Sequence, residues 1–553
     1  MKNKTVLLAC LTCLLSAGAS AQGILGGHVT GNVQIDAQTG HADSTIGAKE
    51  VEQGLLMNAR ADILYTNGDF SAGLRFEAYQ DPLLGFDHQW RGQGLAHYFV
   101  AYHGKHLTLT AGNFYEQFGN GLILRSYEDR YLGLDNALMG VNVQYRPVEG
   151  VTLKALVGKQ RRYWSYGEGL VRGVDGEVSL NSVIKSMADS KLRLTLGAGF
   201  VSKYEADESI AASTEGYELN LPLNVGAGAV RADASFGGWS LQAEYARKGQ
   251  DPSVINKYIY RPGEALTVNL SYSQRGFSAS LQGKRIDNMG FKSVRSETGE
   301  MLFINYLPAT PKQHTYAFPS MYPYVTQVNG EQGLQADVMY KLKKGTLLGG
   351  QYGTDLHLNG SVMTGLDTTV IGGAGTEGYT VGSQPGDLLY GDVSFEVGKK
   401  LSKRVKMTLL YAYQVFNPVV ENELGALHHN HIALADVSWK VNKRHSLRFE
   451  AEWLGSDSRY APAAGESDRR AGDWLMGLVE WNIGTHWFVS ASDQYAYHDG
   501  TGNYYNFSVG YTQGATRLQA GYGKQREGLL CIGGVCRTVP ASNGFTVSLT
   551  TSF

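Results

Sequence analysis

The last stretch of the chain, "NGFTVSLTTSF" (residues 543–553), shows the pattern on which the fold class depends. From Phe545 onward, mostly apolar residues at odd positions alternate with hydroxyl residues at even positions, up to the terminal Phe553. Successive side chains of a strand point to opposite faces, so this pattern predicts a strand with one apolar face and one hydroxyl face. A soluble β-sandwich could end in the same way. The rest of the sequence must therefore distinguish the two.

The same alternation recurs along the chain, and its polar positions carry charges, as in "LRFEAEW" (447–453) and "LQADVMYKL" (334–342). A β-sandwich would bury few charges between its sheets. In a membrane barrel, lipid covers one face of each strand and water wets the other. We therefore expect five charges from these two stretches to face a wet lumen: Arg448, Glu450, Glu452, Asp337 and Lys341.

The connections between these runs alternate in length. Short turns such as "TNGD" (66–69) and "HGK" (103–105) are separated by long segments, the longest at about 115–138, 288–332 and 356–387. This pattern is typical of an up-and-down barrel with short periplasmic turns and long extracellular loops. No fixed repeat of composition indicates a propeller or β-helix. The sequence thus predicts an all-β fold, a single large transmembrane antiparallel barrel of roughly 22–24 strands.

The N-terminus predicts export. Lys2 and Lys4 precede an apolar run that is too short to span a bilayer, and Ala19-Ser20-Ala21 forms a small-x-small cleavage site. We expect residues 1–21 to be a signal peptide cleaved after Ala21, and residues 22–553 to form a barrel in the outer membrane of a Gram-negative bacterium. Cys10 could also mark a lipoprotein signal, but the apolar run continues beyond it.

Composition narrows the function classes. The 49 lysines and arginines nearly balance the 51 aspartates and glutamates, so we expect no nucleic-acid partner. No nucleophile-elbow, zinc-protease, P-loop or dinucleotide-binding motif occurs in the context that it requires. We therefore expect no enzymatic activity and no cofactor.

Two longer stretches carry a resemblance. "NFYEQFGNGLILRSYEDRYLGLDNALMGV" (113–141) and "YLPATPKQHTYAFPSMYPYVTQVNGEQG" (306–333) resemble segments of an exported Gram-negative outer-membrane barrel family with no assigned activity. The terminal strand also resembles the usual barrel-ending pattern. The resemblance implies the fold and location, and it supplies no catalytic or ligand residues.

The first of these stretches crowds charges of both signs around two glycines. We predict that it folds inward as a constriction, and the alternative is a salt-bridged surface loop. The candidate residues are Glu116, Arg125, Glu128, Arg130 and Asp135.

The second stretch is rich in proline, which keeps a chain extended and non-helical. Long loops of this kind are often functional. We consider three roles for its aromatic residues, namely lining or plugging the lumen, contacting a partner protein, and simple packing. The candidates are His314, Tyr316, Tyr322 and Tyr324.

Two shorter motifs remain. Cys531 and Cys536 flank a Gly-Gly turn and predict a small disulfide loop in an oxidising compartment. "ALHHNHI" places His428, His429 and His431 in what reads as an exposed loop before a strand. These histidines are weak metal candidates, because structural sites usually show more ligands at defined spacing.

The leading functional expectation is a channel or transporter for small hydrophilic solutes or oligomers, embedded in the outer-membrane lipid bilayer. The alternative is a plugged barrel that serves as a scaffold for surface lipoproteins or secretion machinery. An outer-membrane hydrolase is the least favoured reading.

Overall fold

The computed structural model describes residues 26–212, 217–373, 375–421, 427–456, 472–497 and 502–553. The predicted signal peptide and its cleavage after Ala21 lie outside the described residues.

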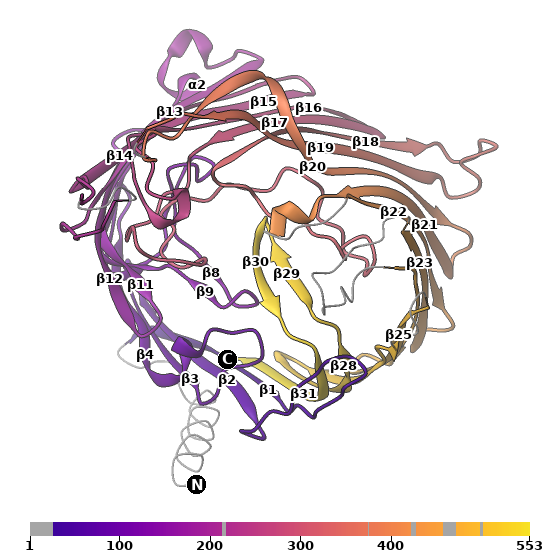
Figure 1. Cartoon of the computed structure of the whole chain (residues 1–553). Helices are drawn as coiled ribbons and strands as arrows, with labels where there is room; N and C mark the ends of the chain where they lie inside the picture. The colour runs from indigo at the N-terminus through magenta and orange to yellow at the C-terminus, as the bar shows by residue number, and fades with distance from the viewer. Residues whose placement is uncertain (1–25, 213–216, 374, 422–426, 457–471, 498–501) are drawn as a thin grey trace.

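Within the described residues, 24 strands close into one antiparallel barrel in which each strand pairs with the next along the chain (Figure 1). The first twelve strands are β1 (His28–Gln38), β2 (Leu56–Asn67), β3 (Phe70–Tyr79), β4 (Gly92–His103), β5 (Leu107–Phe114), β10 (Leu138–Tyr145), β11 (Val151–Arg162), β12 (Ser165–Ser179), β13 (Leu192–Tyr204), β14 (Asn224–Phe236), β15 (Trp239–Lys248) and β16 (Gly263–Gln274). The next twelve are β17 (Phe277–Asp287), β18 (Gly330–Leu342), β19 (Thr354–Val370), β20 (Tyr379–Lys400), β21 (Val405–Phe416), β22 (His428–Lys440), β23 (His445–Ser456), β24 (Trp474–Ile483), β25 (Trp487–Ala496), β27 (Asn506–Gln513), β28 (Thr516–Gln525) and β31 (Ser542–Ser552).

The connections between the strands contain short elements of secondary structure. They are the two-residue strand β26 (Gly502–Asn503), helix α2 (Leu180–Val183) and the 3₁₀ turns η2 (His88–Trp90), η3 (Lys185–Met187), η4 (Val254–Asn256) and η5 (Pro418–Glu421). Among the described residues, none of the helices has the length and apolar character needed to cross a membrane.

The barrel closes between the first strand and the last. β1 pairs antiparallel with β31, in a register that runs from Asn32 opposite Ser552 to Gln38 opposite Thr546. The terminal strand therefore completes the hydrogen bonding of the ring and leaves no open edge there. The predicted all-β barrel and its strand number are confirmed.

The outer face is apolar and carries aromatic rings near the short turns. Trp239, Tyr272, Phe277 and Tyr340 follow one another across four neighbouring strands, with ring centroids 4.8, 6.2 and 6.4 Å apart. Trp239 and Tyr340 each expose about half of their surface. Aromatic belts of this kind mark the membrane–water interface of barrels that span a bilayer.

The barrel interior is filled by the long connections rather than left open. Figure 1 shows four short strands inside the ring: β8 (Glu128–Asp129), β9 (Leu134–Asp135), β29 (Gly528–Ile532) and β30 (Val535–Val539). The connections 115–137 and 288–329 contribute buried apolar side chains that pack on the inward residues of the wall. Phe318 and Ile304, for example, are fully buried. The hydrophobic core of this protein therefore lies between the wall and the inward loops.

One predicted loop is wrong. Most of the segment 356–387 belongs to β19 and β20, which pair up to Val370 opposite Tyr379 through several register irregularities. The segment is rich in glycine, but its threonines suit a strand and irregular pairing accommodates the glycines.

Candidate functional site

The connection between β5 and β10 folds into the barrel as two small hairpins. β6 (Gln117–Phe118) pairs with β7 (Leu124–Arg125), and β8 (Glu128–Asp129) pairs with β9 (Leu134–Asp135). Gly119, with φ +51°, makes the tight turn, and a Cβ there would lie 2.5 Å from the Glu244 carboxylate. That carboxylate accepts a hydrogen bond from the Asn120 amide at 2.7 Å. The wall thus holds the turn in place.

A network of buried ion pairs joins this connection to the barrel wall. Arg161 of β11 donates to Glu77 of β3 at 2.6 Å and to Asp135 at 2.7 Å. Arg75 of β3 lies 3.1 Å from Glu128. Removing one partner of a buried pair leaves an uncompensated charge, at a cost of about 3–5 kcal/mol. The connection is therefore tied firmly to the wall.

The carboxylates of Glu77, Glu128 and Asp135 lie within 4.8 Å of one another, a spacing that would suit a cation. The guanidinium groups of Arg75 and Arg161 already lie among them. These donors supply the positive charge that the carboxylates need, and we assign no metal here.

The structure brings three of the five constriction candidates together. Glu128, Arg130 and Asp135 belong to the ion-pair network, where Arg130 lies 3.5 Å from Asp62. Glu116 lies apart and contacts Lys154 at 2.7 Å. Arg125 stacks over aromatic rings, with its guanidinium carbon 4.0 Å from the centre of the Tyr306 ring.

The insert 288–329 crosses the interior and is held at the β19–β23 side of the wall. His314 lies 3.0 Å from Asp392 of β20. The backbone amides of Ala317 and Phe318 donate to Glu452 at 3.0 and 2.8 Å. Buried backbone amides need such acceptors, so the insert is specifically docked.

The other aromatic candidates of the insert also face protein. Tyr316 donates to Asp436 at 3.3 Å, and Tyr324 donates to Glu331 at 2.6 Å. Tyr322 is buried, with its ring centre 5.3 Å from that of Phe416. The structure therefore places these rings in packing contacts within the barrel rather than on an exposed surface.

The opposite end of the insert is anchored as well. Arg295 is almost fully buried and lies 3.0 Å from Glu205. Burial lowers the pKa of Lys292 to about 8, and its ammonium donates to the backbone carbonyl of Glu297 at 3.1 Å. The insert thus has polar anchors on two sides of the barrel.

The five charges predicted to face the lumen lie on inward positions of their strands. Arg448 contacts Asp436 at 2.9 Å and also Glu450. Glu452 binds the insert, as described above. Asp337 accepts from His357 at 2.6 Å, and Lys341 lies 2.7 Å from Asp355 near the short-turn end.

The histidine cluster was placed in the wrong element. His428, His429 and His431 begin strand β22 instead of preceding it. Side chains of a strand alternate, so His428 points inward and the other two point outward. His429 and His431 contact the hydroxyls of Tyr413 and Tyr411, each at 2.8 Å. The three rings therefore do not converge on one point.

The disulfide loop occupies a position that the sequence did not reveal. Cys531 and Cys536 are bonded across the hairpin of β29 (Gly528–Ile532) and β30 (Val535–Val539). Figure 1 shows this hairpin, in yellow, reaching from the wall into the middle of the barrel. We call residues 528–539 the central hairpin.

Few polar contacts hold the tip of the central hairpin. Gly533 accepts hydrogen bonds from the Tyr306 hydroxyl at 2.8 Å and from the Ala309 amide at 3.2 Å. Gly534 accepts from the Thr326 amide at 3.2 Å. No local signal could have identified these partners, because each lies more than 200 residues away.

A cavity of about 430 Å³ lies between the central hairpin and the closure seam, where β1 meets β31. The seam wall contributes mostly polar side chains, and the hairpin contributes Leu530, Arg537 and Val539. The polar lining from the wall consists of Gln34, Asp36, Gln38, Asn58, Arg60, Gln519, Gln525, Thr546 and Ser548. A second cavity of about 330 Å³ shares Gln525, Leu530 and Val539 with the first, so the two flank the hairpin.

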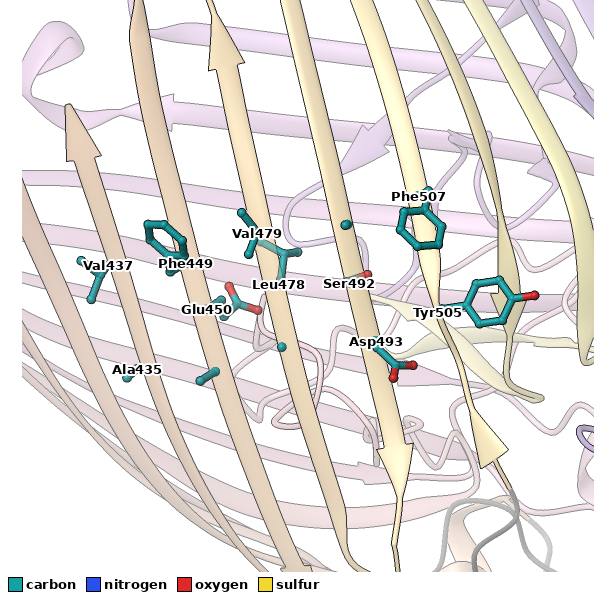
Figure 2. Close-up of a pocket in the computed structure, with 13 residues that line it drawn as sticks. Ala435, Val437, Phe449, Glu450, Leu478, Val479, Ser492, Asp493, Tyr505 and Phe507 are labelled. Carbon is teal, nitrogen blue, oxygen red and sulfur yellow. The ribbon is translucent and has the colours of Figure 1, made fainter. Parts of the chain in front are cut away.

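A third cavity, of about 730 Å³, is a groove along β22–β27 that is lined mainly by outward residues of those strands (Figure 2). Its lining is mostly apolar, with Phe449, Val479 and Phe507 among the members. Asp493 is an acidic member on the outward side of β25, in line with Ala491 and Tyr495. The alternation of "FVSASDQYAY" (488–497) is the signal in the sequence that reveals this outward position.

The chain resembles known proteins in structure rather than in curated sequence. No curated protein matches the chain in sequence. Among solved structures, the chain is similar to the P pilus usher (PapC) translocation pore, with 10% identity, a TM-score of 0.43, and 95% of this chain and 99% of that chain covered. It is similar to a mutant ferric enterobactin receptor (PfeA) of Pseudomonas aeruginosa, with 10% identity, a TM-score of 0.43, and coverage of 95% and 80%.

The chain is also similar to the outer membrane protein opdK of Pseudomonas aeruginosa, with 11% identity, a TM-score of 0.32, and coverage of 73% and 97%. Similarities at this level carry no information about activity. The full length of the chain, residues 1–553, matches the family of unknown function DUF6029, and the chain belongs to that family.

Proposed function

We propose that this protein is a gated outer-membrane channel or transporter for small hydrophilic solutes. The observation that carries the proposal is the cavity between the central hairpin and the closure seam, whose wall side is lined mostly by polar side chains. An outer-membrane location is supported by the closed ring of strands and its apolar, aromatic outer face.

The seam differs from the rest of the inner wall. On β10–β14, the inward residues near the long loops are apolar and buried against the inward connections, as Leu138, Val171 and Val201 illustrate. Along β1, β28 and β31 the inward residues are mostly amides, hydroxyls and glycines, and Asp36 and Arg517 are charged residues on this face. Water and polar solutes favour the second kind of surface, so the seam is the route that we propose for permeation.

The central hairpin is the gate that we propose. The insert 288–329 and the connection 115–137 are anchored to the wall by buried ion pairs and docked amides. Within 528–539, Arg537 is the one charged residue, and it donates to the backbone carbonyls of Tyr131 and Leu84. The hairpin packs on its neighbours through Leu530, Ile532 and Val535, and it can move without separating a buried ion pair.

Planar-bilayer recording tests this function. A variant in which Gly-Gly replaces residues 528–539 should show a larger and more persistent conductance than the wild type, because the two flanking cavities merge. A control variant that replaces the exposed turn 184–189, at the opposite end of the strands, should conduct like the wild type. Equal conductance of the hairpin variant and the wild type would contradict the gate.

A second candidate is a plugged barrel that acts as a scaffold for surface lipoproteins or secretion machinery. The observation that favours it is the firm anchoring of the inward connections, which fill the interior. A scaffold should be silent in bilayers even without the central hairpin. It should also co-purify with a stoichiometric partner from native membranes.

A further inference from the structure

The turns at the short-turn end are basic along one arc of the barrel. Strands β18 to β23 are consecutive neighbours, so their short connections lie beside one another on the rim. Lysine and arginine occupy 3 positions in 341–355, 5 in 397–406 and 3 in 438–445, whereas Asp355 is the one acidic residue in these ranges. We call the set the basic rim: Lys341, Lys343, Lys344, Lys399, Lys400, Lys403, Arg404, Lys406, Lys440, Lys443 and Arg444.

Most of these cations are exposed. Lys341, Lys406 and Lys440 occupy inward strand positions, so the residues available to head groups are those of the turns: Lys343, Lys344, Lys403, Arg404, Lys443 and Arg444. All except Lys399 are in the exposed class. Among the described residues, Lys341 is the member with a carboxylate partner, Asp355 at 2.7 Å. Lys399 donates to the Leu348 carbonyl at 3.3 Å, and Lys400 lies over the Tyr352 ring at 5.1 Å. The arc therefore keeps a large uncompensated positive charge.

Exposed apolar side chains occupy the same turns. Leu347 is 97% exposed and Leu348 is 66% exposed. Their turn is closed by two hydrogen bonds, from the Gly345 amide to the Gly350 carbonyl and from the Gly350 amide to the Thr346 carbonyl, each 2.8 Å long. The two adjacent leucines thus form a small exposed apolar patch beside the lysines of the same turn.

The aromatic belt runs directly beside these turns. Tyr340 of β18 and Trp439 of β22 point outward, and each exposes more than 40% of its surface. Aromatic residues in this position lie at the head-group level of a bilayer. Lysines next to them reach the phosphate region, and neighbouring leucines reach the upper acyl chains. The combination fits a lipid surface better than an acidic protein, which would not require the exposed leucines.

We propose that the basic rim binds the head groups of anionic phospholipids in the leaflet that meets the short-turn end of the barrel. The rest of the rim lacks this character. Its short turns mostly carry fewer cations, and most of these lie beside acidic residues: Asp69, Lys105, Arg146 with Glu149, Lys185, Lys191 and Arg193 with Asp189, and Arg275. The barrel thus recruits anionic lipid on one side only. This inference does not depend on whether the barrel conducts.

The test measures which lipids remain bound to the purified barrel. The full mature chain is reconstituted in nanodiscs of phosphatidylglycerol and phosphatidylcholine, transferred to detergent, and examined by native mass spectrometry. The rim variant carries K343Q, K344Q, K403Q and R404Q. The matched control carries K105Q, R146Q, K185Q and K191Q, which remove the same charge from exposed turns elsewhere on the rim.

The wild type and the control should retain phosphatidylglycerol in preference to phosphatidylcholine. The rim variant should lose this preference by at least about fivefold, since one basic residue near an anionic surface corresponds to about that factor. Unchanged preference in the rim variant would overturn the proposal, and the basic rim would then fit an acidic protein surface. An equal loss in the control would also overturn it, because the effect would follow net charge rather than this arc.

Discussion

Gly31 and Phe553 exchange two backbone hydrogen bonds across the closure seam. The Gly31 amide donates to the Phe553 carbonyl at 2.9 Å, and the Phe553 amide donates to the Gly31 carbonyl at 3.0 Å. A Cβ at Gly31 would lie 2.3 Å from the Phe553 ring, so the ring covers the glycine directly. The last residue of the chain is therefore part of the ring of strands and not a tail.

Deleting Phe553 should weaken barrel closure. The deletion removes two hydrogen bonds, worth about 1 kcal/mol each, and the apolar contact of the ring. We expect a loss of about 2–3 kcal/mol in the free energy of unfolding, measured by urea titration in detergent. Phe553→Leu, which keeps the backbone bonds and an apolar side chain, should lose less. A deletion variant as stable as the wild type would exclude this role.

Replacing Arg161 by methionine should destabilise the barrel strongly. The change leaves Glu77 and Asp135 buried without their shared cation, at a cost of about 3–5 kcal/mol. Arg193→Met is the matched control, because the Arg193 side chain is exposed and, within the described part of the chain, donates to the Ala188 carbonyl alone. This control should change the free energy of unfolding by no more than about 0.5 kcal/mol. Similar unfolding curves for both variants would show that the ion-pair network contributes nothing.

Acid should loosen the connection between β1 and β2. The Lys524 ammonium, 2.6 Å away, and Thr45 hold the pKa of Asp43 at about 2, below its ordinary value of 3.8. A depressed carboxyl pKa contributes stability that is fully present above 3.8 and is lost as pH falls towards 2. The unfolding midpoint should drop across this window in the wild type. In Asp43→Asn this part of the drop should be absent, and an identical pH profile would contradict the assignment.

Gly534→Ala should loosen the central hairpin. Gly534 has φ +87°, and a Cβ there would lie 2.3 Å from the Thr326 hydroxyl and 2.9 Å from Ala309. Gly514→Ala is the control, because Gly514 also has a positive φ, +58°, but open space around it. Both changes carry backbone strain of about 1 kcal/mol, and only the first pushes the tip away from its partners. We expect more frequent openings in bilayer recordings of Gly534→Ala, and none beyond the wild type in the control.

The sequence was sufficient for the barrel because its determinants are local. Alternation assigned the strands and the inward positions of Glu450 and Glu452, since the side-chain period of a strand is fixed, but both carboxylates are buried rather than facing a wet lumen. It could not show that Glu452 binds the amide of Phe318, 134 residues earlier, because that contact exists only after the barrel has closed. The filling of the lumen therefore depends on contacts between residues that are far apart in the sequence.

Two local errors have physical causes. His428, Asn430 and Ile432 alternate inward, but histidine and asparagine are common in loops, so composition obscured the start of β22. In β19 and β20, glycines and register irregularities obscured the alternation. The close spacing of Cys531 and Cys536 in the sequence predicted a disulfide loop. The position of this loop at the centre of the barrel depends on a contact between Gly533 and Tyr306, which are 227 residues apart.

The central claim is that solutes pass along the polar seam beside the central hairpin, and a cysteine at Gln519 tests it most directly. Gln519 lines the seam cavity on the inward face of β28, and its neighbour Leu518 points outward. A charged, water-soluble thiol reagent should reduce the single-channel conductance of Gln519→Cys and leave that of Leu518→Cys unchanged. Modification of Gln519→Cys that is complete by mass spectrometry but leaves the conductance unaltered would contradict the proposed route.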